Sequence, residues 1–398
     1  MVLFYFFFII LMIGYAVLIA YYHREWNRIK EVGLPDALSI NATNAEETRN
    51  GTRISLIIPM RNESKNISGL LESLKRQDFP VELTEIILID DHSTDDTWQL
   101  ISAYNQPGYI RAIRLQDIAG LSPGSFKKQA ISAGIDIASG KLIITTDADC
   151  SFQPQWLSTI VACHHATGSV FIAAPVRFRT KNSFLSIFET LDFITLQGIT
   201  GASVASGFHT MCNGANLAYT KAAFIEADGF NGIDHIPSGD DMLLMYKIFR
   251  KHPDKVSYLK ARQAIVDTSG ADSLRTFFNQ RIRWASKAVH YDDKRIFWVL
   301  MTVYLVNVSF LIAGIASFWK TNYFIFFLLM LIAKLLIEFP FVNRVAMFFG
   351  QQRLMRYFPF MQPFHIMYTI IAGWLGKFGS YEWKGRKISN HGKRIKGT

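Results

Sequence analysis

The chain is poor in cysteine and carries no cysteine cluster. Its 398 residues include only three, Cys150, Cys163 and Cys212. Their number is odd and their spacing fits no metal site, which argues against a disulfide framework and favours free thiols in a reducing cytosol. We also find no internal repeat, no low-complexity segment and no nucleic-acid motif, so the formal charge of +10 is not assigned to nucleic acid.

Charge is absent from the first 22 residues, MVLFYFFFIILMIGYAVLIAYY. A segment of this length and composition can cross a bilayer. A signal peptide would begin with a basic region and end, after a shorter apolar core, at small residues. Because these features are missing, residues 1–22 are expected to form an uncleaved transmembrane helix. The basic flank that opens the linker at 23–52, with Trp26 at the interface, places this side in the cytoplasm.

Two further apolar stretches, residues 296–318 and 322–342, lie close together and predict a transmembrane hairpin. The second contains Lys334 and Glu338, which are costly in lipid, so we expect them to face protein or a polar path. Their i,i+4 spacing equally allows them to pair with each other. With membrane helices present, anionic lipid headgroups become natural partners for the positive charge.

A third apolar stretch, residues 357–378, is interrupted by Pro359 and Pro363. It spans the membrane, re-enters it or lies at its interface, and the sequence leaves these alternatives open. The basic tail, residues 379–398, favours the cytoplasmic side. A spanning third stretch would place this tail outside, so the number of crossings and the charge rule disagree.

The region between the membrane segments alternates two patterns. Apolar runs predict strands and apolar residues at helical spacing predict helices. The strands are expected at 53–59, 85–90, 109–115 and 141–146, and the helices at 63–77, from Asp95 onward and at 125–138. Such alternation is typical of a doubly wound, mostly parallel sheet with helices on both faces. The carboxyl ends of its strands share one edge, where open α/β folds bind ligands.

Two carboxylates, Asp147 and Asp149, follow the strand predicted at 141–146. Residues i and i+2 of an extended segment point the same way, so both can face one divalent cation. A hard ion held by one or two carboxylates usually completes its shell with substrate phosphates. An isolated D-x-D is also typical of a plain polar turn, so the remaining motifs decide between the two interpretations.

Acidic side chains also follow the first two predicted strands. For Glu63 and Asp91 we favour ligand contact, because carboxylates can accept from the N–H groups of a uracil or from ribose hydroxyls. For Asp95 we favour a helix cap. Lys127 and Lys128 lie at a helix start, where cations and backbone N–H groups can meet phosphate. A solvated surface position fits either lysine taken alone.

Asp240 and Asp241 open a predicted helix, DMLLMYKIFRKH, whose dipole stabilises carboxylates at that end. One of the two acids can be a cap, and the other can serve as a general base.

A later helical segment carries Gln280, Arg283 and Trp284 at i, i+3 and i+4, hence on one face, while Arg281 points elsewhere. This face suits a diphosphate, because arginine supplies a fork of donors and tryptophan a flat, rigid wall. Since a membrane stretch follows, an interfacial anchor is the alternative.

Taken in order, the motifs P-x-R-N-E, D-D-x-S-x-D, a lysine-bearing turn, D-x-D, G-D-D and Q-x-x-R-W resemble those of the inverting family 2 glycosyltransferases. They are most similar to the membrane-integrated branch that includes cellulose and hyaluronan synthases and ceramide glucosyltransferases. The resemblance covers residues 53–290 and the flanking membrane helices, and the ending Trp383-Lys384-Gly385-Arg386 is similar to that of bacterial members. It implies a GT-A-like fold at 53–290 and a catalytic domain on the cytoplasmic side of a bacterial inner or plasma membrane.

The resemblance also implies roles for the matching positions, in three groups. For the nucleotide sugar these are Glu63, Asp91, Lys127, Asp147 and Asp149, the last two also meeting Mg²⁺ or Mn²⁺, Asp149 most directly. For catalysis they are Asp241 as the base and Asp240 beside it. For the diphosphate and the acceptor they are Gln280, Arg283, Trp284, Asn213 and Gly214.

The implied reaction is a single displacement that transfers a sugar, with inversion, from a nucleotide sugar to a lipid or lipid-linked acceptor. A uridine carrier is favoured. The alternatives are a processive synthase that extrudes a β-linked polysaccharide and a catalytically inactive membrane protein that binds nucleotide sugar. Three or four membrane helices favour the single transfer, because a polymer channel needs more. A nucleotidyltransferase would share the sheet and the carboxylates but would not need Q-x-x-R-W beside a membrane helix.

Overall fold

A computed structural model of the chain describes residues 2–32, 51–118, 126–236, 238–287, 293–383 and 386–389. The chain divides into two compact units. We call the first the helical unit, which comprises the residues up to 29, residues 180–209 and the residues from 270 on. The second, the sheet unit, comprises residues 30–179 and 210–269.

The main sheet of the sheet unit has seven strands, and their mostly parallel pairing confirms the predicted fold class. In spatial order they are β3 (Ile110–Arg114), β2 (Thr84–Asp90), β1 (Ile54–Met60), β4 (Leu142–Thr145), β8 (Leu217–Thr220), β6 (Phe171–Ala173) and β9 (Val256–Tyr258). All neighbouring pairs are parallel except those that β8 makes with β4 and β6. The central strands are buried along nearly their whole length, which explains their continuous apolar sequences.

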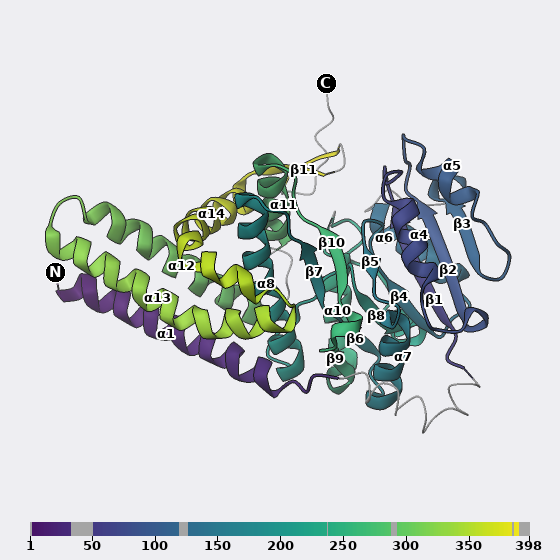
Figure 1. The fold of residues 1–398 in the computed structure, drawn as a ribbon, viewed down its shortest axis with the longest axis horizontal. Helices are drawn as coiled ribbons and strands as arrows, with labels where there is room; N and C mark the ends of the chain where they lie inside the picture. Colours follow the sequence, from purple (N-terminus) through teal and green to yellow (C-terminus); the bar gives the residue numbers. More distant parts are fainter. Residues whose placement is uncertain are drawn as a thin grey trace. The chain divides into compact units, whose positions relative to one another are not determined.

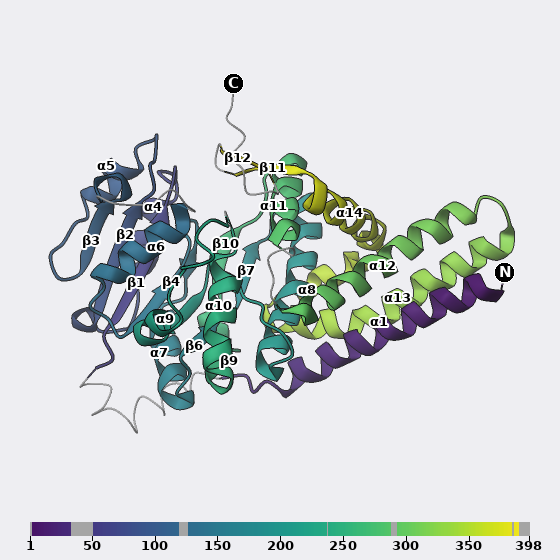
Figure 2. The same ribbon diagram turned by 180° about the vertical axis from the view of Figure 1, so that it is seen from behind.

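Helices cover both faces of this sheet, with α4 on one face and α6 on the other (Figures 1 and 2). The helices of the unit are α4 (Ile67–Lys75), α5 (Thr97–Ser102), α6 (Phe126–Ile137), α7 (Trp156–Thr167), α9 (Lys221–Glu226) and α10 (Asp240–Lys251). On α6, a Cβ at Gly134 would lie 2.7 Å from Ile89 Cδ1 and 2.8 Å from Ile57 Cγ2. The glycine therefore lets α6 approach β1 and β2 closely. This close packing fixes the position of Lys127 and Lys128, at the start of the helix, relative to the sheet.

A second, smaller sheet in the same unit joins three short strands, β5 (Ser151–Phe152), β10 (Val266–Ser269) and β7 (Val176–Arg179). Its edge strand β5 begins two residues after Asp149 and pairs antiparallel with β10. Across β10 and β7, Arg177 forms two hydrogen bonds with Asp267, of 2.6 and 2.9 Å. The sequence patterns predicted neither β8 nor the short strands of this sheet.

Within its described residues, the helical unit contains six α-helices and a small β-hairpin. The helices are α1 (Val2–Arg28), α8 (Phe184–Ser206), α11 (Leu274–Ser286), α12 (Lys294–Ala316), α13 (Thr321–Phe348) and α14 (Phe358–Phe378), and the hairpin joins β11 (Ser380–Trp383) to β12 (Arg386–Ser389). α1 packs on α8, α12 and α13, and α11 packs on α14. In the described part of the chain, three helices are long and apolar enough to cross a membrane, over Tyr5–Arg28, Lys294–Ala316 and Thr321–Phe348.

The unit boundaries differ from the domain expected at 53–290. The helices α8 and α11 lie inside that range but belong to the helical unit. The reason is packing, since α8 buries most of its length and contacts α1, α13 and α14. The third C-terminal stretch forms the single helix α14, which is not among the three candidate spans.

Lys334 and Glu338 lie one turn apart on α13 and are both buried. Lys334 Nζ lies 2.5 Å from Glu338 Oε1 and donates to Gln362 Oε1 of α14 at 2.6 Å. Gln362 Nε2 donates in turn to Glu338 Oε2 at 2.8 Å, and the Tyr15 hydroxyl of α1 donates to Glu338 as well. The two residues therefore pair with each other and also face protein, which joins the two alternatives left open by the sequence.

Candidate functional site

The D-x-D carboxylates lie in a turn, not on a strand. β4 ends at Thr145, residues 148 and 149 form a turn, and Cys150 N donates to Asp147 O at 3.3 Å. The i, i+2 argument for a common direction was therefore wrong, because strand alternation stops before Asp147. Burial raises the pKa of the Cys150 thiol well above its usual value, and the neighbouring Asp149 and Asp147 add to this, so the thiol stays neutral.

Asp149 is held by the small sheet. Thr268 of β10 donates through its hydroxyl to Asp149 Oδ2 at 2.9 Å, and Arg179 Nη2 of β7 donates to the Asp149 carbonyl at 2.9 Å. A residue fixed at both backbone and side chain loses little further freedom when it binds a ligand. These contacts orient the second carboxylate of the motif from strands that lie far away in the sequence.

Asp147 and Asp240 meet through one cation, Lys127 of α6. Lys127 Nζ lies 2.8 Å from Asp147 Oδ1 and 3.2 Å from Asp240 Oδ2. Burial of the ammonium works against its charge, but Asp147, Asp240 and Asp241 outweigh burial and raise the pKa of Lys127 above its usual value. The lysine is therefore charged, and it draws two acids together that are separated by more than ninety positions.

The loop that precedes β8 lies against the ion pair between Lys127 and Asp240. A Cβ at Gly214 would lie 3.4 Å from Lys127 Nζ and 3.5 Å from Asp240 Oδ2, so the glycine backbone lies against the ion pair. Asn213 turns its side chain to its own loop, where Oδ1 accepts from Ala215 N at 3.0 Å. Thr146 ties this loop to the end of β4 by donating to Ala215 O at 2.7 Å. Gly214 thus stands at the predicted site, whereas Asn213 shapes the loop that presents it.

Asp240 and Asp241 form the first turn of α10 behind Gly239, which has φ 83°. The N-cap is the glycine, so neither acid occupies the cap position proposed as the simple alternative. Asp241 Oδ1 accepts from Met242 N at 2.8 Å, and both carboxylates gain from the helix dipole. With Lys127 on Asp240, the two neighbouring acids differ in their surroundings.

Glu63 and Asp91 follow β1 and β2, which are parallel neighbours. Asp91 is buried, its N–H donates to Met60 O at 2.7 Å, and its Oδ1 lies 3.1 Å from His92 Nδ1. Glu63 Oε2 accepts from Asn66 Nδ2 at 2.6 Å. Beside them, Asn62 and His92 adopt positive φ of 53° and 56°, a costly conformation for residues other than glycine.

Asp95 joins the two strand ends. Its Oδ2 accepts from Ser64 N at 3.2 Å, and its Oδ1 accepts from Thr97 N at 3.1 Å and from the Thr97 hydroxyl at 2.5 Å. Partial burial opposes ionisation, but these hydrogen bonds outweigh it and lower the pKa of Asp95 to about 2. The formal N-cap of α5 is Asp96, so Asp95 supports the helix start from one position earlier than the cap.

The Q-x-x-R-W residues lie on α11 of the helical unit, and the acids above lie in the sheet unit. Gln280, Arg283 and Trp284 are half-buried. Arg281 is buried, its Nη2 lies 2.8 Å from Asp192 Oδ2, and its guanidinium carbon is 4.3 Å from the centre of the Trp284 ring. Arg281 Nη1 also donates to Gln280 Oε1 at 3.0 Å. The arginine set aside by the sequence reasoning therefore supports two residues of the motif.

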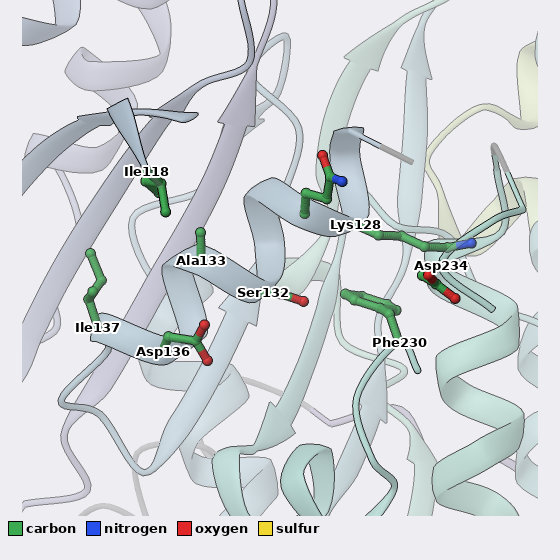
Figure 3. Close-up of a pocket in the computed structure, with 9 residues that line it drawn as sticks. Ile118, Lys128, Ser132, Ala133, Asp136, Ile137, Phe230 and Asp234 are labelled. Atoms are coloured by element: carbon green, nitrogen blue, oxygen red, sulfur yellow. The ribbon is translucent and has the colours of Figure 1, made fainter. Parts of the chain in front are cut away.

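A cavity of about 300 Å³ opens beside α6 (Figure 3). Its lining includes Lys128, Ala133 and Asp136 of α6 together with Phe230 and Asp234. Among the described residues, this lining contains Lys128, the chain neighbour of Lys127, but none of the predicted site residues. The cavity is therefore distinct from the carboxylate group around Lys127.

Within the described residues, no three or more His, Cys, Asp and Glu side chains are grouped so that they could hold a metal ion. A protein-only metal cage is therefore not present in that part of the chain. The carboxylates of Asp147 and Asp149 offer the oxygen atoms that a hard cation prefers, and such an ion usually completes its shell with phosphate oxygens.

Two family models match the chain. One, described as Glycosyl transferase family 2, matches residues 55–224, and the other, described as Glycosyl transferase family group 2, matches residues 142–375, more than half of the chain. Glycosyltransferase AglE of Haloferax volcanii is 26% identical over 193 residues, which are 48% of this chain and 59% of AglE. Undecaprenyl-phosphate 4-deoxy-4-formamido-L-arabinose transferase of Yersinia pestis is 31% identical over 156 residues, 38% of this chain and 45% of the relative. The chain spans about half the length of the curated relatives it matches.

Among solved structures, the mannosyltransferase PcManGT from Pyrobaculum calidifontis, in complex with GDP-Man and Mn²⁺, is similar with a TM-score of 0.57. The sequence identity is 15%, and the match covers 93% of this chain and 98% of that one. This likeness shows a GT-A fold. The family models, one of which matches more than half of the chain, establish that the chain belongs to glycosyl transferase family 2.

Proposed function

We propose that this protein is a membrane-bound inverting glycosyltransferase that moves a sugar from a nucleotide sugar to a lipid or lipid-linked acceptor. The observation that carries the proposal is the group in which Lys127 joins Asp147 of the D-x-D turn to Asp240 of the α10 N-terminus. In a family 2 chain, this group supports one site for diphosphate binding and for proton abstraction. A binding protein without activity would not need a second acid beside the ion pair.

Asp241 is the proposed general base. It takes the proton from an acceptor hydroxyl, whose oxygen then forms a bond to the anomeric carbon while the bond from that carbon to the diphosphate oxygen breaks. The leaving electron pair stays on the nucleotide diphosphate. Because one base and no enzymatic nucleophile take part, the displacement is single and inverts the anomeric centre. The ion pair between Lys127 and Asp240 favours Asp241 for this role, and Asp240 supports it as part of the catalytic pair.

The nucleotide diphosphate is assigned to Lys127, Asp147 and Asp149. A divalent cation bound by the two carboxylates would supply positive charge to the leaving diphosphate, and the Mn²⁺ of the PcManGT complex supports this assignment. Lys127 adds a fixed ammonium at the same place. Arg283, Gln280 and Trp284 are proposed to line the diphosphate and acceptor end.

The nucleoside is assigned to Glu63 and Asp91 at the ends of β1 and β2. Each carboxyl group already has a side-chain partner, Asn66 for Glu63 and His92 for Asp91, and the backbone of Asp91 is bonded to Met60. Uridine is the favoured nucleoside, because a carboxylate can accept a hydrogen bond from the N–H group of its uracil base. A neighbour in the solved structures holds GDP-Man, so guanosine is the competing carrier.

Three spans also support a consistent membrane topology. If α1, α12 and α13 cross and α14 does not, residues 23–32 and all residues after α13 lie on the same side. The basic flank of α1 makes this side cytoplasmic, and the basic tail then follows the charge rule as well. A short set of spans further favours transfer to a lipid-linked acceptor over extrusion of a polymer, and the named activity of the Yersinia pestis relative is of that kind.

The test is a transfer assay with the full chain in membranes, using radiolabelled UDP- and GDP-sugars and extracted lipids. We expect label to move into the lipid extract, with loss of transfer in excess chelator and recovery with Mn²⁺ or Mg²⁺. Label in an insoluble polymer would favour the processive alternative. Binding of the donor without any transfer would favour the inactive binding protein, and full activity in chelator would remove the metal.

A further inference from the structure

Lys128, the lysine next to Lys127, makes a different kind of contact. Its side chain is buried, with the residue 1% exposed, and its ammonium donates to Ile233 O at 2.6 Å, Ile236 O at 2.7 Å and Ser238 O at 3.3 Å. An ammonium group has three N–H donors and no acceptor. Three carbonyl oxygens therefore match its full donor capacity, which offsets the cost of burying the charge.

The three carbonyls belong to the loop that leads directly into α10. Ser238 precedes Gly239, the N-cap, and Asp240 and Asp241 follow. Figure 3 shows the Lys128 side chain leaving α6 toward Asp234 of this loop, while Ile137 and Asp136 lie further along the helix. The ammonium is thus bonded to the backbone just two positions before the first of the two acids.

Neighbouring residues on a helix point about 100° apart, so Lys127 and Lys128 reach different partners from one turn of α6. Lys127 meets the side chain of Asp240, and Lys128 meets the backbone before it. One rigid helix therefore holds the start of α10 at two points. Gly134 in turn sets the distance of that helix from the sheet.

Lys247 of α10 provides an internal comparison. Its ammonium donates to Asp228 O at 3.1 Å, Gly229 O at 2.8 Å and Asn231 O at 2.8 Å, at the opposite end of the same loop. The contact is of the same type, three carbonyls around one ammonium. It differs in place, because its carbonyl partners, Asp228 to Asn231, lie at the start of the loop and not directly before Asp240.

We propose that Lys128 is a positioning residue that fixes the α10 N-terminus, and with it the Asp241 carboxylate, relative to the D-x-D turn. This inference rests on the proposed function of Asp241 as the base. Because the lysine acts through backbone placement and not on the donor, its loss lowers kcat and leaves KM for the nucleotide sugar nearly unchanged. Lys247 also holds the loop, but we expect it not to position Asp240 and Asp241.

The experiment compares Lys128→Met with Lys247→Met in the full chain. We expect kcat of Lys128→Met to fall about 100-fold, as a misplacement of about 1 Å can cause, with KM for donor within about twofold. We expect Lys247→Met to keep kcat within about twofold of wild type, while its melting temperature falls as much as that of Lys128→Met. Lys128→Arg keeps the charge but spreads its donors in a planar fork, so its kcat should lie between Lys128→Met and wild type.

Amide hydrogen exchange gives a readout that needs no activity. In Lys128→Met the amides of the first turn of α10 should exchange about tenfold faster or more, since a charged hydrogen bond is lost there, whereas Lys247→Met should leave them unchanged. If Lys128→Met does not fold, Lys128→Arg carries both measurements. Equal kcat for the two methionine variants, or unchanged exchange at α10, would overturn the inference. A wild-type chain without transferase activity would instead refute the proposed function, and the exchange experiment would still decide on the role of Lys128.

Discussion

The two units both pair lysine with acids, but they do so under different conditions. In the sheet unit, the side chains of Lys127, Asp147 and Asp240 are 20%, 39% and 13% exposed, so the group reaches solvent. In the helical unit, the side chains of Lys334 and Glu338 are 0% and 7% exposed, and Gln362 and Tyr15 complete their hydrogen bonds. The same residue types thus form an open group in one unit and a closed, buried network in the other.

This difference in exposure distinguishes residues proposed for catalysis from residues that stabilise the fold better than residue type does. A buried network is closed to a ligand from solvent, and it specifies how α1, α13 and α14 pack together. An open group can exchange its partners for the proposed diphosphate and cation. We therefore expect substitutions in the sheet unit to change turnover, and substitutions in the closed network to change stability.

The largest effect is expected for Asp241→Asn. The amide has nearly the same shape but cannot accept the proton, so kcat should fall by about 10²- to 10⁴-fold, while the melting temperature stays close to wild type. The measurement is single-turnover transfer with saturating donor. Asp234→Asn, an exposed acid of the preceding loop, is the matched control and should keep its rate. Retained transfer in Asp241→Asn would remove the base assignment.

The next effect is one of stability. Glu338→Gln leaves the buried Lys334 ammonium without its counter-charge, which should cost about 3–5 kcal/mol of stability. Thermal unfolding of the detergent-solubilised chain measures it, and activity per folded molecule should be unchanged. The double variant Lys334→Met/Glu338→Leu removes both charges and should recover much of the loss. A catalytic defect with normal stability would place the closed network among the functional residues.

A smaller effect is expected where the small sheet holds Asp149. Thr268→Val removes the hydroxyl that donates to the carboxylate without changing the shape of the side chain. Loss of one charged hydrogen bond, about 1.5 kcal/mol, should raise the Mn²⁺ concentration needed for half-maximal activity about tenfold. Thr268→Ser keeps the donor and should behave like wild type. An unchanged metal requirement would show that Asp149 needs no support from β10.

The smallest effect concerns pH. The folded pKa of Asp95 is about 2, below its usual 3.8, so the ionised form stabilises the fold above pH 4. That contribution should be lost as pH falls from about 4 to 2, and because the group is partly exposed it should amount to only about 1 kcal/mol. Tryptophan fluorescence at increasing denaturant follows it. Asp95→Asn should flatten this part of the stability profile, and an equal slope in both proteins would contradict the assignment.

Much of the sheet unit was predictable because its strands and helices follow from patterns of neighbouring residues in the sequence. Apolar runs and helical spacing predicted β1 to β4 and α4 to α6, and parallel pairing brings strand ends to one edge. Lys127 and Asp147 were placed on neighbouring elements in this way. Their meeting with Asp240 was not derivable from spacing, since it depends on how α10 folds back.

The residues that escaped prediction are those fixed by tertiary contact. Lys127 and Lys128 look alike in the sequence, yet one joins carboxylates and the other is buried under three carbonyls. Thr268 supports Asp149 from a four-residue strand that no pattern marks. Arg281 was judged by its helix face, but its partner Asp192 lies on α8, a helix that the sequence reasoning did not describe.

The most direct test of the contrast between the units is one transfer assay on Asp241→Asn and Glu338→Gln, each normalised to its folded fraction. We expect Asp241→Asn to be folded but to transfer almost no label to lipid. We expect Glu338→Gln to unfold at a lower temperature but, while folded, to transfer label at the wild-type rate. The opposite pattern, an active Asp241→Asn and an inactive but stable Glu338→Gln, would contradict the roles assigned to the two units.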